Sequence, residues 1–218
     1  MKTEAENRGY WYWTWDEGTP PPSKTTISIA FSGYSDVLEA IEQSKHVKDQ
    51  LVGTKYIAIG GGNANGAFTK SKVEALTREI NTGAFTGYDG IAYDIEEGDP
   101  NLEEVFAESF QAARTNGLQV LVTVSHSAPY GISDAAKLMT SFFTNENINI
   151  LSPQLYTSGN ENENNYQTSH GVCWSEYKDC KAAVVPSIVE ASLYESAKQY
   201  FLNDGVTLEG YIQWTQTS

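Results

Sequence analysis

The chain has 218 residues, of which 40% are hydrophobic and 19% charged, so it has enough apolar side chains for a packed core and too few charges for a disordered chain. Its 28 Asp and Glu residues outnumber its 14 Lys and Arg residues, and the formal net charge of −14 repels phosphate backbones and anionic lipid surfaces. Nucleic acid and membrane partners are therefore not expected, whereas a neutral polysaccharide is compatible. We expect one domain over residues 1–218, acting as a monomer.

Segments rich in aromatic and β-branched residues recur along the chain and indicate about eight strands. They cover residues 10–15, 26–31, 56–59, 91–95, 120–124, 150–156, 183–189 and 211–214. Helical patterns lie between most of them, at residues 36–51, 69–81, 101–116, 134–145 and 194–203. Because strands that alternate with helices form a parallel sheet, the fold class is α/β, and a compact (β/α)8 TIM-type barrel is favoured over an open doubly wound sheet.

Three connections depart from a regular barrel. Residues 16–25, which include three consecutive prolines, leave little room for a helix after the first strand, and the sequence given ends just after the eighth, so the helices after strands 1 and 8 are expected to be missing. Residues 157–181 are polar and without helical period, which predicts a loop over the active face. Cys173 and Cys180 in this loop could form a disulfide, as in a secreted protein whose signal peptide has been removed, and two reduced thiols fit equally well.

The fourth predicted strand carries two acidic residues on one face. Alternation along a strand places Ala92, Asp94 and Glu96 together, opposite the apolar Ile91 and Ile95. The apolar face is expected to pack against helices, so the two carboxyl groups point into the barrel at its C-terminal end, where barrel enzymes carry catalytic groups. Carboxylates this close couple, and one is held protonated as a general acid requires. The alternative is that the two carboxylates only solvate the end of the strand or cap a neighbouring helix.

Residues 89–96, Asp-Gly-Ile-Ala-Tyr-Asp-Ile-Glu, resemble the Asp-Gly-x-Asp-x-Asp-x-Glu signature of the chitinases and related endoglycosidases of glycoside hydrolase family 18. Other motifs follow in family order: Gly-Tyr-Trp at 9–11, Ile-Ser-Ile-Ala-Phe at 27–31, Tyr-Ile-Ala-Ile-Gly-Gly-Gly at 56–62, Pro-Gln-Leu-Tyr at 153–156 and Gly-Tyr-Ile-Gln-Trp at 210–214. The resemblance spans nearly the whole chain. It implies a glycosidase that cleaves β-1,4-linked N-acetylglucosamine in chitin or chito-oligosaccharides. No cofactor is expected, and no metal either, because the three histidines lack metal-ligand spacing.

The resemblance also implies a retaining mechanism in which the substrate's own N-acetyl group is the nucleophile. Glu96 is expected to protonate the glycosidic oxygen and later to deprotonate water, while Asp94 holds the N-acetyl group. Tyr156 is expected to donate its hydroxyl to the carbonyl oxygen of that group. Further substrate contacts are expected from Trp214, Gln154 and Gly61. Tyr156 and Trp214 could instead be ordinary amphipathic residues of the barrel rim.

One acidic position departs from the signature, because the inner aspartate of the family is Ala92 here. In the family this residue lies below the position of Asp94 and shares charge with it, so its loss predicts slower turnover or a shifted pH optimum. A chitinase-like protein that binds glycans with weak or no catalysis is the alternative. An endo-β-N-acetylglucosaminidase acting on N-glycans is also open, since the acids do not distinguish it from a chitinase. His126, after the fifth strand, is expected at the barrel rim or at the mouth of the site.

Overall fold

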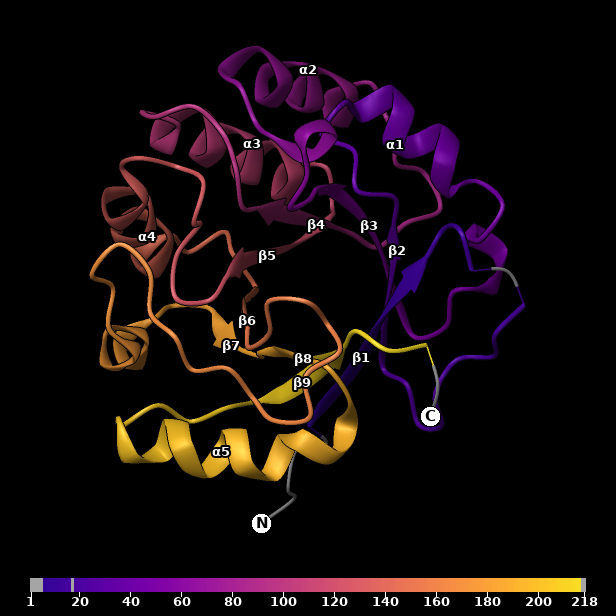
Figure 1. The fold of residues 1–218 in the computed structure, drawn as a ribbon. Helices are drawn as coiled ribbons and strands as arrows, with labels where there is room; N and C mark the ends of the chain where they lie inside the picture. The colour runs from indigo at the N-terminus through magenta and orange to yellow at the C-terminus, as the bar shows by residue number, and fades with distance from the viewer. Residues whose placement is uncertain (1–5, 17, 217–218) are drawn as a thin grey trace.

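The computed structural model describes residues 6–16 and 18–216, and their strands close into a parallel barrel (Figure 1). The sheet order is β5-β4-β3-β2-β1-β9-β8-β6-β7, and an additional pairing between β5 and β6 closes it, which rules out the open sheet. All strand pairings are parallel. The strands are β1 (Asn7–Trp13), β2 (Ile27–Phe31), β3 (Thr54–Gly60), β4 (Gly90–Ile95), β5 (Gln119–Ser125), β6 (Ile150–Gln154), β7 (Ala183–Val184), β8 (Ser187–Ile188) and β9 (Gly210–Gln213).

The strand predicted at residues 183–189 is divided into two short pieces. Both β7 and β8 pair with β6, and β8 also pairs with β9, so together they occupy one position in the barrel. The barrel therefore has eight strand positions, as the sequence pattern predicted. Pro186 stands between the two pieces; it has no N–H to donate to a ladder, which accounts for the break.

The helices surround the barrel: α1 (Val37–Ser44), α2 (Lys70–Asn81), α3 (Glu103–Thr115), α4 (Ala135–Thr144) and α5 (Tyr194–Asn203). Asp36 caps α1 by accepting a 3.0 Å hydrogen bond from the backbone N–H of Glu39. The helix predicted over residues 36–51 ends at Ser44 and is followed by a turn and the short 3-10 helix η1 (Lys48–Gln50). Val47 and Leu51 are four residues apart and both buried, which is the spacing of a helix. This spacing explains why the sequence predicted a helix that continues to residue 51.

Within the described residues, no helix follows the first or the last strand, as expected from the sequence. Between β1 and β2, all described positions form turns or irregular chain, and no helix follows β9 up to Gln216. The connection after β6 contains no α-helix, only the 3-10 helix η3 (Trp174–Asp179). Cys173 and Cys180 lie at opposite ends of η3 and both thiols are free, so the disulfide considered above is not formed.

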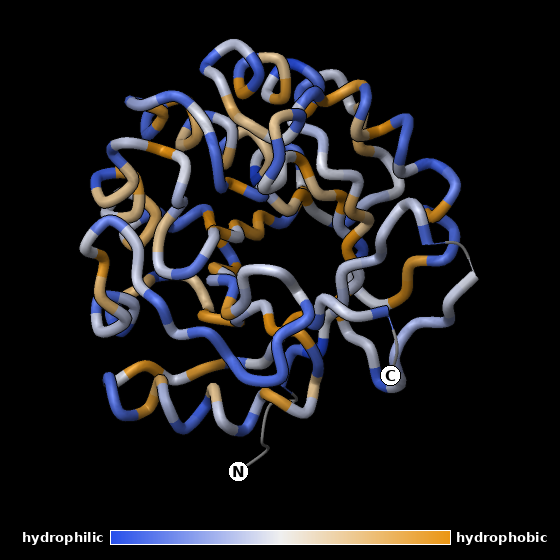
Figure 2. The backbone as a smooth tube through the Cα atoms, viewed as in Figure 1, coloured by the Kyte–Doolittle hydropathy of each residue, from blue (hydrophilic) through white to orange (hydrophobic). Residues whose placement is uncertain are grey.

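Side-chain alternation divides the core into two layers. An inner cluster fills the barrel, and an outer cluster lies between the strands and the helices, where Ile91 and Ile95 are found. Figure 2 shows the most hydrophobic segments on the strands and more polar chain on the outside. No helix within the described residues is long and apolar enough to cross a membrane. The inner cluster consists of Trp11, Ile27, Ile29, Phe31, Tyr56, Ala58, Ala92, Leu121, Ile150, Val185 and Ile212.

Candidate functional site

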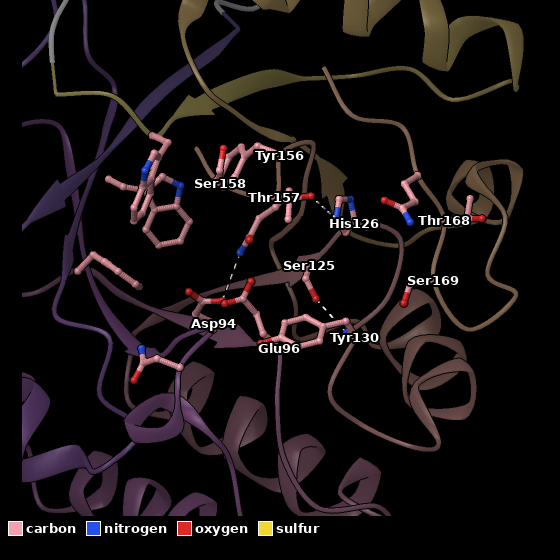
Figure 3. A pocket seen from close by; sticks show the side chains of 17 residues that line it. Asp94, Glu96, Ser125, His126, Tyr130, Tyr156, Thr157, Ser158, Thr168 and Ser169 are labelled. Carbon is pink, nitrogen blue, oxygen red and sulfur yellow. Dashed lines mark hydrogen bonds between the residues drawn. The ribbon is translucent and has the colours of Figure 1, made fainter. Parts of the chain in front are cut away.

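A cavity of about 530 Å³ opens at the C-terminal ends of the strands, within the size range of small-ligand sites (Figure 3). Glu96 directly follows β4, and Trp214 directly follows β9. One wall is aromatic and the opposite wall carries hydroxyl, amide and imidazole groups. The lining residues are Trp11, Phe31, Gly62, Asn63, Asp94, Glu96, Ser125, His126, Tyr130, Gln154, Tyr156, Thr157, Ser158, Gln167, Thr168, Ser169 and Trp214.

Asp94 and Glu96 form a buried, hydrogen-bonded pair of carboxyl groups at the bottom of this cavity. Asp94 is 3% exposed and Glu96 is 8% exposed. Burial, together with the charge of Glu96, raises the pKa of Asp94 well above its usual value. Burial also raises the pKa of Glu96 to about 7, although its hydrogen bond to Asp94 works in the opposite direction. Both carboxyl groups therefore hold a proton more tightly than an exposed carboxyl group does.

Gln154 holds Asp94 from the neighbouring side of the barrel. Its side-chain Nε2 donates a 3.3 Å hydrogen bond to Oδ1 of Asp94 and a 3.1 Å bond to the Thr123 hydroxyl. The Thr123 hydroxyl in turn donates to the carbonyl oxygen of Ser152, at 2.7 Å. Because all of these groups are buried and bonded, the orientation of the Asp94 carboxyl group is fixed before any ligand binds.

Tyr156 and Trp214 meet on the aromatic side of the cavity, with their ring centroids 6.0 Å apart. Tyr156 is buried, which raises the pKa of its phenol, and its hydroxyl shares a hydrogen bond with Ser187. Trp214 packs edge-on against Phe31 and at a tilt against Trp13. One cavity therefore contains five of the predicted site residues, Asp94, Glu96, Tyr156, Gln154 and Trp214. Their roles stay predictions.

The glycine that lines the cavity is Gly62, one residue after the predicted Gly61. Gly61 is buried and is not among the residues that line the cavity, whereas Gly62 is. A Cβ atom added at Gly62 would lie 2.5 Å from Oε2 of Glu96, so a side chain at this position would displace the Glu96 carboxyl group. Gly62 therefore leaves the space in which Glu96 sits. The run Gly60 to Gly62 fits a tight turn and a close approach of a ligand equally well, and the sequence did not say which of these glycines faces the cavity.

Ala92 lies below Asp94 on the same face of β4, in the inner apolar cluster and fully buried. Its partners across the sheet are Ala58 on β3 and Leu121 on β5. The position of the family's inner aspartate is therefore apolar on both sides. Asp94 has Glu96 and Gln154 as its hydrogen-bond partners instead.

The long connection after β6 contributes residues 157, 158 and 167–169 to the polar wall, in line with the loop expected over this face. Its first turn is organised by Glu161, whose carboxylate accepts backbone hydrogen bonds from Thr157 at 3.1 Å, Ser158 at 2.6 Å and Gly159 at 3.1 Å. Burial opposes the ionisation of Glu161, but the hydrogen bonds outweigh it and lower its pKa to about 2. This turn is braced against Trp214, since a Cβ atom at Gly159 would lie 2.6 Å from the indole.

Most of the other lining residues carried no sequence signal, and His126 and Tyr130 are the largest polar side chains among them. His126 adopts a positive φ of 53° and lines the cavity, with Nε2 3.1 Å from the Thr157 hydroxyl. Tyr130 also lines it, and no motif marked this residue. The described residues contain no cluster of three or more His, Cys, Asp or Glu side chains that could hold a metal ion. The arrangement suits proton transfer and the binding of a polar ligand with apolar faces.

Two solved structures have a fold similar to this closed parallel barrel over most of their length. A Streptomyces coelicolor protein described as chitinase A superposes with a TM-score of 0.61 at 12% identity, over 97% of this chain and 92% of that one. The catalytic domain of a family 18 chitinase from the fern Peteris ryukyuensis superposes with a TM-score of 0.55 at 16% identity, over 95% of this chain and 91% of that one.

These similarities show that the chain has the fold of family 18 chitinases. No protein-family model matches the sequence, and a search of curated proteins found no match. At identities this low the fold is shared, while activity and substrate have to be argued from the site.

Proposed function

We propose that this chain is a glycoside hydrolase that cleaves β-1,4-linked N-acetylglucosamine in chitin or chito-oligosaccharides by a retaining, substrate-assisted mechanism. The observation that carries the proposal is the buried Asp94–Glu96 pair, which lies in one cavity with Tyr156 and Trp214. A carboxyl group whose pKa lies near 7 is suited to give a proton to a leaving group and to take one back from water.

In the first step, the carbonyl oxygen of the substrate's N-acetyl group attacks the anomeric carbon, the glycosidic C–O bond breaks, and Glu96 gives its proton to the leaving oxygen. Asp94 accepts a hydrogen bond from the N–H of the acetamido group, and the Tyr156 hydroxyl donates to its carbonyl oxygen. In the second step, Glu96 takes a proton from a water molecule as the water oxygen attacks the anomeric carbon, and the C–O bond of the oxazolinium ring breaks. Gln154 keeps Asp94 oriented through its hydrogen bond, while Ala92 stands where the family has a second aspartate.

The test is the stereochemistry of the product. The protein is incubated with the N-acetylglucosamine tetramer, and the products are followed by chromatography and by proton NMR. We expect the β anomer to form first and to mutarotate later, since two inversions retain configuration. Initial formation of the α anomer would contradict the substrate-assisted mechanism. Cleavage of a glycopeptide between the two N-acetylglucosamines of its core, which leaves one of them on the peptide, without cleavage of the tetramer would instead identify an endo-β-N-acetylglucosaminidase.

The burial of Ala92 favours a second candidate, a glycan-binding protein of the same fold with little or no catalysis. Without a carboxyl group below it, Asp94 has only Glu96 with which to share a proton. In that case, titration of the tryptophan fluorescence with the tetramer would give saturable binding while no product formed at any pH.

The activity is expected to fall as pH rises above about 7, because burial raises the pKa of Glu96 to that value and the acid must be protonated to act. The charge of Glu97 adds to this effect, so Glu97→Gln lowers the pKa of Glu96 and moves the alkaline limb of kcat/KM to lower pH. Glu74→Gln, at an exposed position of α2, is the matched control and leaves the limb in place. An alkaline limb unmoved by Glu97→Gln would argue against this charge effect.

A further inference from the structure

Tyr130 is a large aromatic side chain that stays 49% exposed although it lines the cavity. It is held at three points. Its backbone N–H donates a 2.9 Å hydrogen bond to the Ser125 hydroxyl, its carbonyl oxygen lies 3.1 Å from Nε2 of His170, and its hydroxyl donates to the carboxylate of Glu97. An exposed ring fixed in this way is oriented before any ligand arrives.

The same segment is tied to the backbone of the proposed acid. The N–H of Gly131 donates a 2.8 Å hydrogen bond to the carbonyl oxygen of Glu96, and the N–H of Gly98 donates to the carbonyl oxygen of Gly131 at 3.2 Å. A Cβ atom at Gly131 would lie 2.7 Å from Cγ of Glu97, so the close approach requires glycine. The ring of Tyr130 is thereby placed at a fixed position relative to Glu96.

Tyr130 lies on the opposite side of Glu96 from the rest of the proposed machinery. In Figure 3, Asp94, Glu96 and Tyr130 follow one another across the cavity, and Ser125, His126 and Ser169 lie on the Tyr130 side. A general acid protonates the oxygen that joins two sugars, so the sugar held by Asp94 and Tyr156 lies on one side of Glu96 and the leaving sugar on the other.

We propose that Tyr130 is the platform of the leaving-group subsite, on which the departing N-acetylglucosamine ring stacks. This assignment rests on the proposed hydrolase function. An apolar face of a pyranose ring can stack on the half-exposed aromatic ring of Tyr130. The hydroxyl groups of the sugar meet the polar wall formed by His126 and residues 167–169. The leaving sugar is thus bound by one ring and a set of hydrogen bonds, whereas the opposite side of the cavity is dominated by Trp11, Phe31 and Trp214.

The test compares two substrates that differ only in the need for this subsite. The N-acetylglucosamine tetramer has a leaving sugar, whereas the oxazoline of the disaccharide has none and reports the second step alone. We expect Tyr130→Ala to lower kcat/KM on the tetramer about tenfold more than on the oxazoline, the size of one lost aromatic contact of roughly 1.4 kcal/mol. Tyr130→Phe keeps the ring and is expected to retain most of the selectivity. Tyr200→Ala removes an exposed tyrosine of α5 and serves as the control.

The outcomes separate this assignment from the proposed function. Equal losses on both substrates, or no loss on either, in a Tyr130→Ala protein with wild-type circular dichroism would overturn the subsite while leaving the hydrolase in place. If the wild type processes neither substrate, the hydrolase proposal fails and the leaving-group assignment fails with it. A loss on the tetramer that Tyr130→Phe rescues supports the stacking ring rather than the hydroxyl.

Discussion

Replacing Glu96 with glutamine is expected to lower kcat on the N-acetylglucosamine tetramer by about 10²–10⁴-fold, the usual contribution of a general acid–base residue. The amide has the same shape and can still bond to Asp94, but it has no proton to transfer. Since the cavity and its aromatic wall are unchanged, binding of the tetramer should remain near the wild-type level. Loss of turnover with retained affinity is the result that separates a catalytic group from a structural one.

Initial rates from chromatography and affinities from tryptophan fluorescence provide the two measurements. Glu108→Gln makes the same chemical change at an exposed position of α3 and is expected to behave as the wild type. A Glu96→Gln protein that kept more than about a tenth of the wild-type turnover would show that another group supplies the proton, since a tenfold effect corresponds to only about 1.4 kcal/mol of the barrier.

Replacing Ala92 with aspartate restores the family signature, but it places a carboxyl group in the apolar interior of the barrel. Ala92 is fully buried between Ala58 and Leu121. We expect the free energy of unfolding at pH 7 to fall by about 3 kcal/mol, the scale of an uncompensated buried charge. Ala92→Asn is the matched control, because it adds the same volume and polarity without a titratable proton.

The pH dependence separates the charge from the added volume. Burial raises the pKa of the new carboxyl group in the folded state, while the unfolded chain releases the same proton near pH 3.9. The folded state then binds more protons, so the stability lost through Ala92→Asp is smallest below about pH 4 and grows as pH rises toward the folded pKa. Urea denaturation at pH 4, 5, 6 and 7 measures this. Equal, pH-independent losses in the Asp and Asn proteins would contradict it.

The same variant also tests what the missing acid costs in turnover. A carboxyl group below Asp94 gives it a second partner for its proton, so kcat per folded molecule is expected to rise even though the fold is weakened. No rise in turnover would show that Gln154 and Glu96 already suffice to orient Asp94 and share its proton.

The order of strands and helices could be predicted because it is encoded by local periodicity. The alternation of Ile91 and Ile95 with Asp94 and Glu96 determines which side of β4 faces the barrel interior, whatever the rest of the chain does. Boundaries were less certain. The helix predicted to reach residue 51 ends at Ser44, since a 3-10 turn buries Val47 and Leu51 equally well.

The residues of the site that follow barrel strands were also accessible from the sequence. Parallel strands end at the same rim, so Glu96, Tyr156 and Trp214 had to gather there once the barrel was inferred. No comparable rule predicts which loop residues face the cavity. That Gly62 rather than Gly61 faces the cavity depends on one turn after β3, and the exposure of Tyr130 depends on how the chain after β5 meets the residues that follow β4.

The sequence by itself thus determined the strand periodicity, the inward face of β4 and the acidic pair, because these follow from the spacing of neighbouring residues. Only the tertiary structure decided that the sheet closes through β5 and β6, that Ala92 is enclosed by apolar neighbours, and that Cys173 and Cys180 stay apart. It also placed the polar loop and Tyr130 beside Glu96. These contacts join residues far apart in the chain, and their geometry is set by barrel closure rather than by any local pattern.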